Sequence, residues 1–349
     1  MRVEELETPV AVVDIDCMEA NIARLQTYLD RHHIANRPHI KTHKIPEIAQ
    51  RQIEAGAVGI TCQKVSEAEV MAEAGFSDIF IPYNIVGEAK LSRLMKLADR
   101  ATISVTADST VVCDGLSTAA QHADLTLTVL VECDMGAERC GVQSPQEAAD
   151  LARYIARLPN LHFGGLMTFP ANDHLDDFVH ATRSLLVNDH LPIERVSGGG
   201  TPVMWQAHTH AELTEYRAGI YVYGDRWSLR AGSVQLENCA MKVHTTVVSR
   251  PTPDRGILDA GSKTLSSDLL GLDGYGYICE YPAAKLYALS EEHGHVDFSA
   301  CANKPKIGER LTIIPNHCCT VTGLADEIVA MRGDEVEVIW QVVARNKVK

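Results

Sequence analysis

The chain has 349 residues, with 32 lysines and arginines against 46 aspartates and glutamates, so its formal net charge is −14. A surface this acidic repels nucleic-acid backbones and anionic membranes, and no apolar run is long enough to cross a membrane. Hydrophobic residues make up 46% and charged residues 22%, which excludes a disordered or fibrous chain and indicates a large globular core.

The length favours one large barrel with an added domain, or two domains. The first residues are acidic and carry no hydrophobic signal segment, so we expect a cytoplasmic protein. In that compartment the 10 cysteines are expected to be mostly reduced, buried thiols rather than disulfides.

Short apolar or β-branched runs alternate with helical stretches through the first two thirds of the chain. After a first strand at 10–14 and a helix at 17–31, strands are expected at residues 37–41, 59–63, 79–83, 102–107, 126–134, 164–169, 195–198 and 218–224. Between two of them, Ser66 with Glu69 is typical of a capping box and Gly75 of a helix end. Alternating strands and helices imply parallel pairing, and this number of units in about 200 residues predicts a (β/α)8 barrel of the TIM type.

The rhythm changes near residue 232, where helices give way to strands joined by turns. Strands are expected at residues 239–249, 256–259, 275–279, 284–289, 310–315, 328–332 and 335–343. We therefore expect an α/β chain with a barrel over residues 11–229 and an all-β domain over residues 230–349, with residues 1–10 joining the β domain.

The end of the expected strand at 37–41 carries cations. Alternation places Arg37, His39 and Lys41 on one face, toward the barrel interior, where a charged group is costly. Desolvation and neighbouring cations lower the pKa of a lysine at a barrel mouth and make its amine available for a Schiff base. The alternative is that Lys41 or Lys44 is a solvated loop lysine.

Glycines follow the two expected strands at which barrels commonly bind phosphate. The residues concerned are Ser197, Gly198, Gly199 and Gly200 after one strand, and Arg217, Gly219, Ile220 and Tyr221 at the other. Glycine lets backbone N–H groups approach an anion closely, and a following helix adds a favourable dipole, so we expect a phosphate cup. A tight turn also needs glycine, which is the alternative for the triplet alone.

Arg139 lies in the loop after the expected strand at 126–134. Its guanidinium can bind a phenolate or a carboxylate of a ligand, or it can form a structural ion pair with Asp134 or Glu138. Both interpretations are open from the sequence.

His317 and Cys319 are two residues apart on an expected strand, so their side chains should project from the same face. Imidazole and thiolate suit Zn²⁺, and two protein ligands leave positions for water or substrate. The alternative is that both residues fill the core.

Several separated motifs, taken in order, resemble one family. They are Thr8–Asp14, Arg37–Lys44, Asp134–Gly141, Ser197–Thr201, Asp259–Lys263, Ser290–Gly294 and Pro315–Cys319. Over nearly its whole length the sequence resembles the D-threonine aldolase and D-serine dehydratase family of pyridoxal 5′-phosphate (PLP) enzymes, whose fold is an alanine-racemase-like barrel with a β domain (PLP fold type III).

The resemblance implies roles for individual residues. Lys41 is implied as the catalytic Schiff-base lysine, Arg139 as the contact to the cofactor ring oxygen, and His317 with Cys319 as ligands of a divalent metal (Zn, Mn or Mg). The phosphate is implied to bind backbone amides of Gly198, Gly199, Gly219 and Ile220. Further pocket residues implied for cofactor or substrate are Gln63, His39, Tyr83 and Thr168, and His174 is implied to contact a substrate hydroxyl in catalysis.

The activity implied by the resemblance is a lyase reaction on D-configured β-hydroxy amino acids. We expect the D-threonine aldolase type, a retro-aldol cleavage to glycine and an aldehyde. Aldolases of the family commonly show His-x-Asp and dehydratases His-x-Cys, so Cys319 keeps open a D-serine or 3-hydroxy-D-aspartate dehydratase, which yields a keto acid and ammonia. More remote alternatives are a PLP-binding protein without turnover and a racemase. The resemblance also implies a homodimer.

Overall fold

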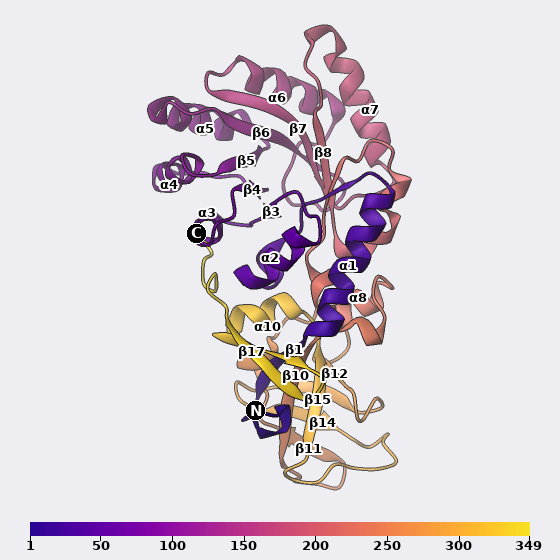
Figure 1. Cartoon of the computed structure of the whole chain (residues 1–349). Coiled ribbons are helices and arrows are strands. Elements are labelled where there is room, and N and C mark those ends of the chain that lie inside the picture. The colour runs from indigo at the N-terminus through magenta and orange to yellow at the C-terminus, as the bar shows by residue number, and fades with distance from the viewer. The chain divides into compact units, whose positions relative to one another are not determined.

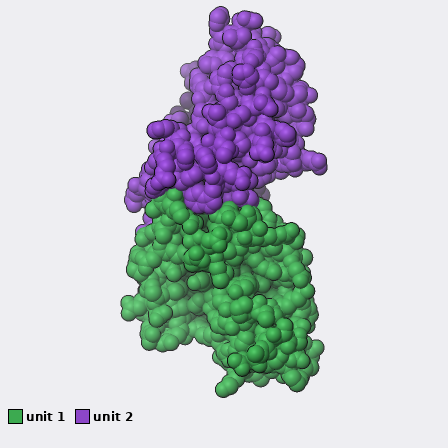
Figure 2. All heavy atoms as spheres, turned by 90° about the vertical axis from the view of Figure 1, so that its right-hand side faces the viewer, with its two compact units in different colours: residues 1–24, 42–47, 220–346 green, residues 25–41, 48–219, 347–349 purple.

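The computed structural model of the protein describes residues 1–349, and the chain divides into two compact units (Figure 2). We call residues 25–41, 48–219 and 347–349 the barrel unit, and residues 1–24, 42–47 and 220–346 the sheet unit. None of the helices combines the length and the apolar character that a membrane crossing requires.

The barrel unit is built on an eight-stranded parallel sheet in the order β2-β9-β8-β7-β6-β5-β4-β3. Its strands are β2 Ala35–Asn36, β3 Ile60–Thr61, β4 Asp78–Ile81, β5 Thr102–Ala107, β6 Leu127–Asp134, β7 Leu161–Phe169, β8 Arg195–Gly199 and β9 Glu215–Arg217. A parallel bridge between His39 and Thr61 links the two ends of this order. The predicted fold class, a TIM-type parallel barrel with an added β domain, is confirmed.

Helices follow the strands and cover the barrel. They are α2 Pro46–Glu54, α3 Val65–Glu73, α4 Glu88–Ala98, α5 Thr110–Ala123, α6 Pro145–Arg157 and α7 Leu175–Leu186, with α1 Ile15–Arg31 before β2. Helices α4 to α7 lie side by side outside the sheet (Figure 1). In α6, Ser144 accepts a hydrogen bond from the backbone N–H of Glu147, and buried residues at Ala148, Leu151 and Ile155 share one face.

The interior of the barrel is partly apolar and partly charged. Phe80, Leu130 and Met167 form a fully buried cluster contributed by β4, β6 and β7. Because strands of a parallel barrel are covered on both sides, they read as nearly continuous apolar runs, as in Leu127–Cys133.

The sheet unit contains a nine-stranded sheet (Figure 1). Its strands are β1 Val10–Asp14, β10 Met241–Ser249, β11 Arg255–Leu258, β12 Gly276–Ile278, β13 Lys285–Leu289, β14 Gly294–Asp297, β15 Arg310–Pro315, β16 Glu327–Arg332 and β17 Glu335–Gln341. The N-terminal strand β1 pairs antiparallel with β10 and parallel with β16. Short helices α8 Arg226–Arg230, α9 Ser262–Leu265 and α10 Cys318–Leu324 complete the unit.

Several local expectations were wrong. The strand expected at 37–41 occupies only Ala35–Asn36 and is followed by a 3-10 turn at Ile40–Thr42, since Pro38 has no N–H to give to a ladder. The strand expected at 218–224 is β9 at Glu215–Arg217, with a 3-10 turn at Ile220–Val222. The short strand β14 was not anticipated.

The capping box expected at Ser66 does not form. Helix α3 begins at Val65 with Lys64 as the N-cap, and the Ser66 hydroxyl donates to the backbone carbonyl of Lys349 instead (2.7 Å). The helix does end before Gly75, whose φ of +100° suits glycine.

Candidate functional site

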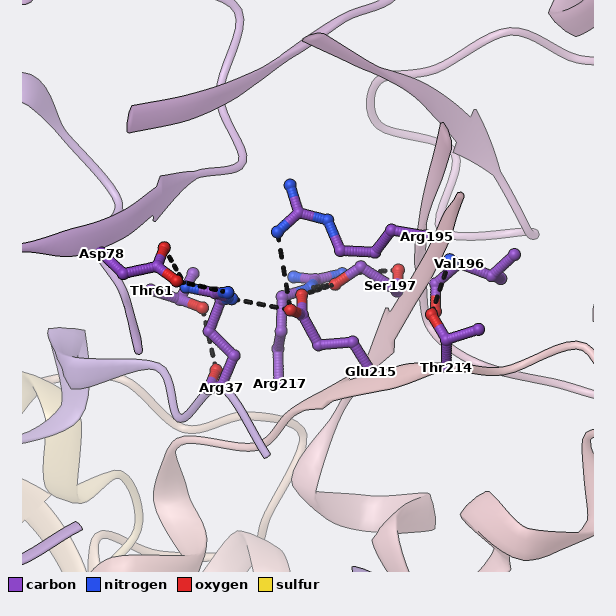
Figure 3. Close-up of polar contacts among 9 residues, drawn as sticks. All are labelled: Arg37, Thr61, Asp78, Arg195, Val196, Ser197, Thr214, Glu215 and Arg217. Carbon is purple, nitrogen blue, oxygen red and sulfur yellow. Dashed lines mark hydrogen bonds and ion pairs between the residues drawn. The ribbon is translucent and has the colours of Figure 1, made fainter. Parts of the chain in front are cut away.

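A buried charge network lies inside the barrel around Glu215 of β9 (Figure 3). Its carboxylate accepts hydrogen bonds from Arg37 Nε (2.7 Å) and Ser197 Oγ (2.6 Å), and Arg195 Nη1 lies 3.6 Å away. Arg37 also forms a two-pronged pair with Asp78, at 2.6 and 3.1 Å. Burial alone would raise the pKa of Glu215, but Arg37 and Arg195 outweigh it and lower the pKa. Glu215 is therefore a fixed, ionised anchor.

Arg217 is held by this network at the end of β9. Its Nε donates to Ser197 Oγ (2.9 Å), and its Nη2 donates to the carbonyls of Thr168 (2.7 Å) and Ser197 (3.3 Å). Burial lowers the pKa of Arg217 to about 10, so the guanidinium remains a cation at neutral pH. The Nη1 group is left with N–H donors for a ligand.

Glycines make a close-packed cradle beside Arg217. A Cβ on Gly198 would stand 2.6 Å from Leu213 Cδ1, and one on Gly199 would stand 2.9 Å from the Arg217 carbonyl oxygen. Gly200 has a φ of +123° and precedes a 3-10 helix at Thr201–Thr209. Glycine at 198 and 199 is therefore required by packing within the barrel. A run of glycines is also the kind of backbone that an anion cradle uses.

Thr168, whose carbonyl accepts a hydrogen bond from Arg217, lies next to the glycine cradle. Its side chain is fully buried, and its Oγ1 has no hydrogen-bond partner in the structure. The same oxygen lies 3.6 Å from the place where a Cβ on Gly198 would stand. A buried hydroxyl without a partner is costly, so this atom indicates a polar ligand group.

Lys41 belongs to a second group in the barrel unit. Its Nζ lies 3.5 Å from Gln63 Oε1, which is also hydrogen-bonded to His39 Nε2 (3.0 Å). Gln63 is held in turn by a hydrogen bond from its N–H to Glu67 Oε2 (2.6 Å). Two other residues predicted for the pocket, Tyr83 and His174, have different surroundings. The Tyr83 ring packs against Lys64 Nζ, which lies 3.6 Å from the ring centroid. His174 is the exposed N-cap residue of α7.

Arg139 does not form the ion pair that was the structural alternative. Asp134 Oδ1 instead accepts the N–H groups of Gly136 and Ala137, at 2.9 and 2.8 Å, and the Arg139 guanidinium lies 5.0 Å from the Phe169 ring centroid. Because Arg139 is exposed and its charge is not consumed by Asp134, it is open to an anionic ligand.

Sequence reasoning missed Glu132 on β6. Its side chain is buried, Thr106 Oγ1 donates to it at 3.4 Å, and burial raises its pKa, against the opposing effect of Arg139 and Arg217. The only signal in the sequence is its position near the end of a barrel strand.

His317 and Cys319 lie in the sheet unit, but not on a strand. His317 is the N-cap of α10 and Cys319 lies in the first turn of that helix, which corrects the strand geometry expected from the sequence. The two side chains are nevertheless within hydrogen-bonding reach of each other. A hydrogen bond also joins Cys319 Sγ to Thr42 Oγ1 (3.3 Å), and His317 Nδ1 lies 2.7 Å from Asp268 Oδ2.

The electrostatics of this pair favour a thiolate beside an imidazolium. Hydrogen bonding from Cys318 and the neighbouring His317 hold the pKa of Cys319 well below the ordinary thiol value, in spite of burial. Burial opposes the charged form of His317, but Cys319 and Asp268 outweigh it and raise the imidazole pKa to about 9. A divalent cation that replaces the imidazolium proton would meet one nitrogen and one sulfur donor.

Other polar groups surround the pair. No group of three or more His, Cys, Asp and Glu side chains gathers as metal ligands, so a cation at this place would have only His317 and Cys319 as protein donors. The Tyr223 hydroxyl is fully buried in this unit without a hydrogen-bond partner. Asp225 fixes the helix start by accepting the Cys318 N–H (3.2 Å), and burial raises its pKa to about 6. Tyr223, Asp225 and Asp268 were not singled out from the sequence.

Comparisons with known proteins match both parts of the chain. Residues 13–227 match the family described as "Alanine racemase, N-terminal domain", and residues 240–331 match "Putative serine dehydratase domain". D-threonine aldolase of Arthrobacter sp is 36% identical over 360 aligned residues, which cover 97% of this chain and 93% of the relative.

Solved structures of similar proteins cover the whole chain. D-threonine aldolase from Filomicrobium marinum has a TM-score of 0.91 at 30% identity, covering 100% of this chain and 98% of the other. D-threo-3-hydroxyaspartate dehydratase from Delftia sp. HT23 has a TM-score of 0.87 at 28% identity, covering 97% and 98%. A cysteine variant of a D-threo-3-hydroxyaspartate dehydratase is known in a metal-free form.

Proposed function

The chain belongs to the D-threonine aldolase and D-serine dehydratase family with an alanine-racemase-like barrel, and on that premise we propose that it is a PLP-dependent lyase for D-configured β-hydroxy amino acids. The observation that carries the proposal is the joint presence of an arginine-anchored glycine cradle with Lys41 and a thiolate-imidazole pair at His317 and Cys319. A protein that only carries PLP would not need the pair His317 and Cys319.

The barrel residues fit PLP. The cradle of Gly198 and Gly199 suits its phosphate, and the buried Thr168 hydroxyl and the free Nη1 donors of Arg217 suit polar atoms of its ring. Lys41 supplies the amine that holds the cofactor covalently, and Gln63 and His39 orient that amine. When bound, PLP supplies an electron-accepting ring that stabilises negative charge at the substrate Cα.

The pair His317 and Cys319 is proposed to hold one divalent cation. Imidazole with thiolate favours Zn²⁺, and positions that the protein leaves open are available to water or to a substrate hydroxyl. A cation held by His317 and Cys319 would supply Lewis-acid polarisation of a substrate hydroxyl.

We place the aldolase reaction first, because the D-threonine aldolase relative is 36% identical over almost the whole chain. In this reaction the Cα–Cβ bond breaks and gives glycine and an aldehyde. The second candidate is a dehydratase, and Cys319 favours it, since thiolate in place of carboxylate in this motif is the pattern of the family's dehydratases.

The test is incubation of the PLP-loaded protein with D-threonine, D-serine and 3-hydroxy-D-aspartate, with L-threonine as the control. Aldehyde and glycine are assayed against keto acid and ammonia, before and after metal removal with a chelator. Aldehyde with equimolar glycine supports the aldolase, and keto acid with ammonia supports the dehydratase. If no product forms from any D-substrate, the proposed lyase activity is contradicted. If turnover continues after complete metal removal, the proposed metal dependence is contradicted.

The role of Lys41 is tested by Lys41→Ala. The purified wild-type protein with PLP should show a visible absorption band that borohydride abolishes with covalent retention of the cofactor. The variant should retain no cofactor covalently after the same treatment; covalent retention in the variant would place the attachment on another residue.

A further inference from the structure

The strongest feature outside the roles assigned above is Asp268, which contacts His317 from a distant part of the chain. Its Oδ2 lies 2.7 Å from His317 Nδ1, and the two residues are 49 positions apart in the sequence. A carboxylate only accepts hydrogen bonds, so the hydrogen between these atoms belongs to Nδ1 of the imidazole. The other ring nitrogen, Nε2, then carries the lone pair in the neutral ring.

The carboxylate of Asp268 is itself fixed. Its second oxygen, Oδ1, accepts the backbone N–H of Leu270 (3.3 Å), and its own N–H donates to Ser266 Oγ (3.2 Å). Each oxygen therefore has one defined partner, and only Oδ2 faces the imidazole.

The backbone around Asp268 is strained. Ser266 has a φ of +67° and Leu270 a φ of +46°, which are unfavourable for side chains other than glycine. Such conformations persist where other contacts hold them. Here the Ser266 hydroxyl accepts from the Asp268 backbone N–H and the Leu270 N–H donates to the Asp268 carboxylate, so both strained residues are hydrogen-bonded to Asp268.

From these contacts we infer that Asp268 is the positioning residue of the metal site: it holds His317 in the tautomer and orientation that present Nε2, together with Cys319 Sγ, to a divalent cation. The inference rests on the metal site of the proposed function and adds a residue to it. In metal proteins the second ring nitrogen of a ligating histidine commonly donates to such a carboxylate, and loss of that partner costs about 10–100-fold in metal affinity. Asp268 itself does not bind the cation.

The test measures metal affinity rather than turnover. Full-length protein with PLP is stripped of metal and titrated with Co²⁺, which gives a thiolate-to-metal charge-transfer band when Cys319 binds. The variants are Asp268→Ala and Asp268→Asn, with Asp273→Asn as the matched control. Asp273 lies nearby in the chain with its side chain 80% exposed, where it pairs with Lys285 and not with His317.

We expect Asp268→Ala to weaken Co²⁺ binding by about 10–100-fold. Asp268→Asn should lose less, because its amide oxygen can still accept from Nδ1–H, and Asp273→Asn should bind like the wild type. At saturation the charge-transfer band should persist in all three variants, since the thiolate is intact. Thermal unfolding of the metal-free proteins reports whether each variant is folded. If Asp268→Ala does not fold, the comparison of Asp268→Asn with wild type still tests the inference.

The outcomes separate this inference from the proposed function. If wild type binds Co²⁺ with a charge-transfer band and His317→Ala abolishes tight binding, the metal site stands. Unchanged affinity in both Asp268 variants would then overturn the positioning role alone, and so would a lowered unfolding temperature with unchanged affinity. If wild type binds no Co²⁺, the proposed metal site and this inference both fail.

Discussion

Glu215→Gln removes one buried charge from the barrel network and keeps the shape of the side chain. The carboxylate serves two close donors, Arg37 Nε–H and Ser197 O–H, and it lies near Arg195 as well. An amide offers one acceptor oxygen, so one of the two donors meets an NH2 group instead. Breaking a buried ion pair costs about 3–5 kcal/mol, and because Arg37 retains Asp78 we expect the lower end, about 3 kcal/mol.

The pH dependence of this loss has a definite sign. The pKa of Glu215 in the folded protein lies below its ordinary value of 4.5, because Arg37 and Arg195 outweigh burial. Its stabilising contribution is therefore fully present above pH 4.5 and is lost as the pH falls through the folded-state pKa. The difference between wild type and variant should be constant near neutrality and should narrow in acid below pH 4.5.

The assay is urea unfolding of both proteins at neutral pH and in acid. Glu194→Gln is the control, because Glu194 is 51% exposed, pairs only with His162 in the same unit, and should change the unfolding free energy by no more than about 0.5 kcal/mol. If Glu215→Gln lowers the unfolding free energy by no more than the control substitution does, the anchoring role of Glu215 is refuted. An equal loss in neutral and acid solution would refute its electrostatic origin.

Other substitutions test the cradle and the metal pair. Gly198→Ala places a Cβ 2.6 Å from Leu213 Cδ1 and 3.2 Å from Ala171 Cβ, so overpacking should lower the unfolding free energy by about 1–3 kcal/mol in urea, whereas Gly115→Ala in α5 should leave it unchanged. Thr168→Val removes a buried hydroxyl that has no partner, so the cofactor-free protein should be as stable as wild type or more so, while PLP binding weakens; equal PLP affinity would remove this residue from the ligand pocket. Cys319→Ser should abolish the Co²⁺ charge-transfer band and weaken Zn²⁺ binding in a competition titration, and an unchanged band would place the thiolate ligand elsewhere.

The barrel could be predicted because its signals are local and repeated. The strand expected at 102–107 coincides with β5, whose residues are mostly apolar or β-branched, and in the sheet unit the strand expected at 310–315 coincides with β15. Arg37 and His39 were expected to face the interior, and both are buried. The strand ends were harder, because the chain leaves the ladder in 3-10 turns at Ile40–Thr42 and Ile220–Val222 that depend on neighbouring strands.

The partners of the candidate residues could not be predicted, because they come from distant segments. Glu215 meets Arg37 only because the first and last strands of the barrel, β2 and β9, pair with each other in parallel. Asp268 reaches His317 through a loop whose backbone has positive φ at residues that are not glycine, and no residue pattern encodes that shape. The sequence therefore identified Lys41 with its neighbours His39 and Gln63, but missed Glu215 and Asp268, which hold Arg37 and His317 from distant segments.

The charge of the barrel interior bears on how an acidic protein would bind the anionic cofactor proposed above. The carboxylate of Glu215 is already paired with Arg37 and Arg195. Arg37 has a second acidic partner, Asp78. The other buried carboxyl near Arg217 is Glu132, whose pKa is raised by burial against the opposing effect of Arg139 and Arg217. Arg217 is thus a buried cation whose nearest hydrogen-bond partners, Ser197 and Thr168, are uncharged acceptors. Its positive charge lies in the barrel interior, where its attraction to a nearby anionic group is screened less than at the surface, so this local charge favours an anionic ligand in spite of the net charge of −14.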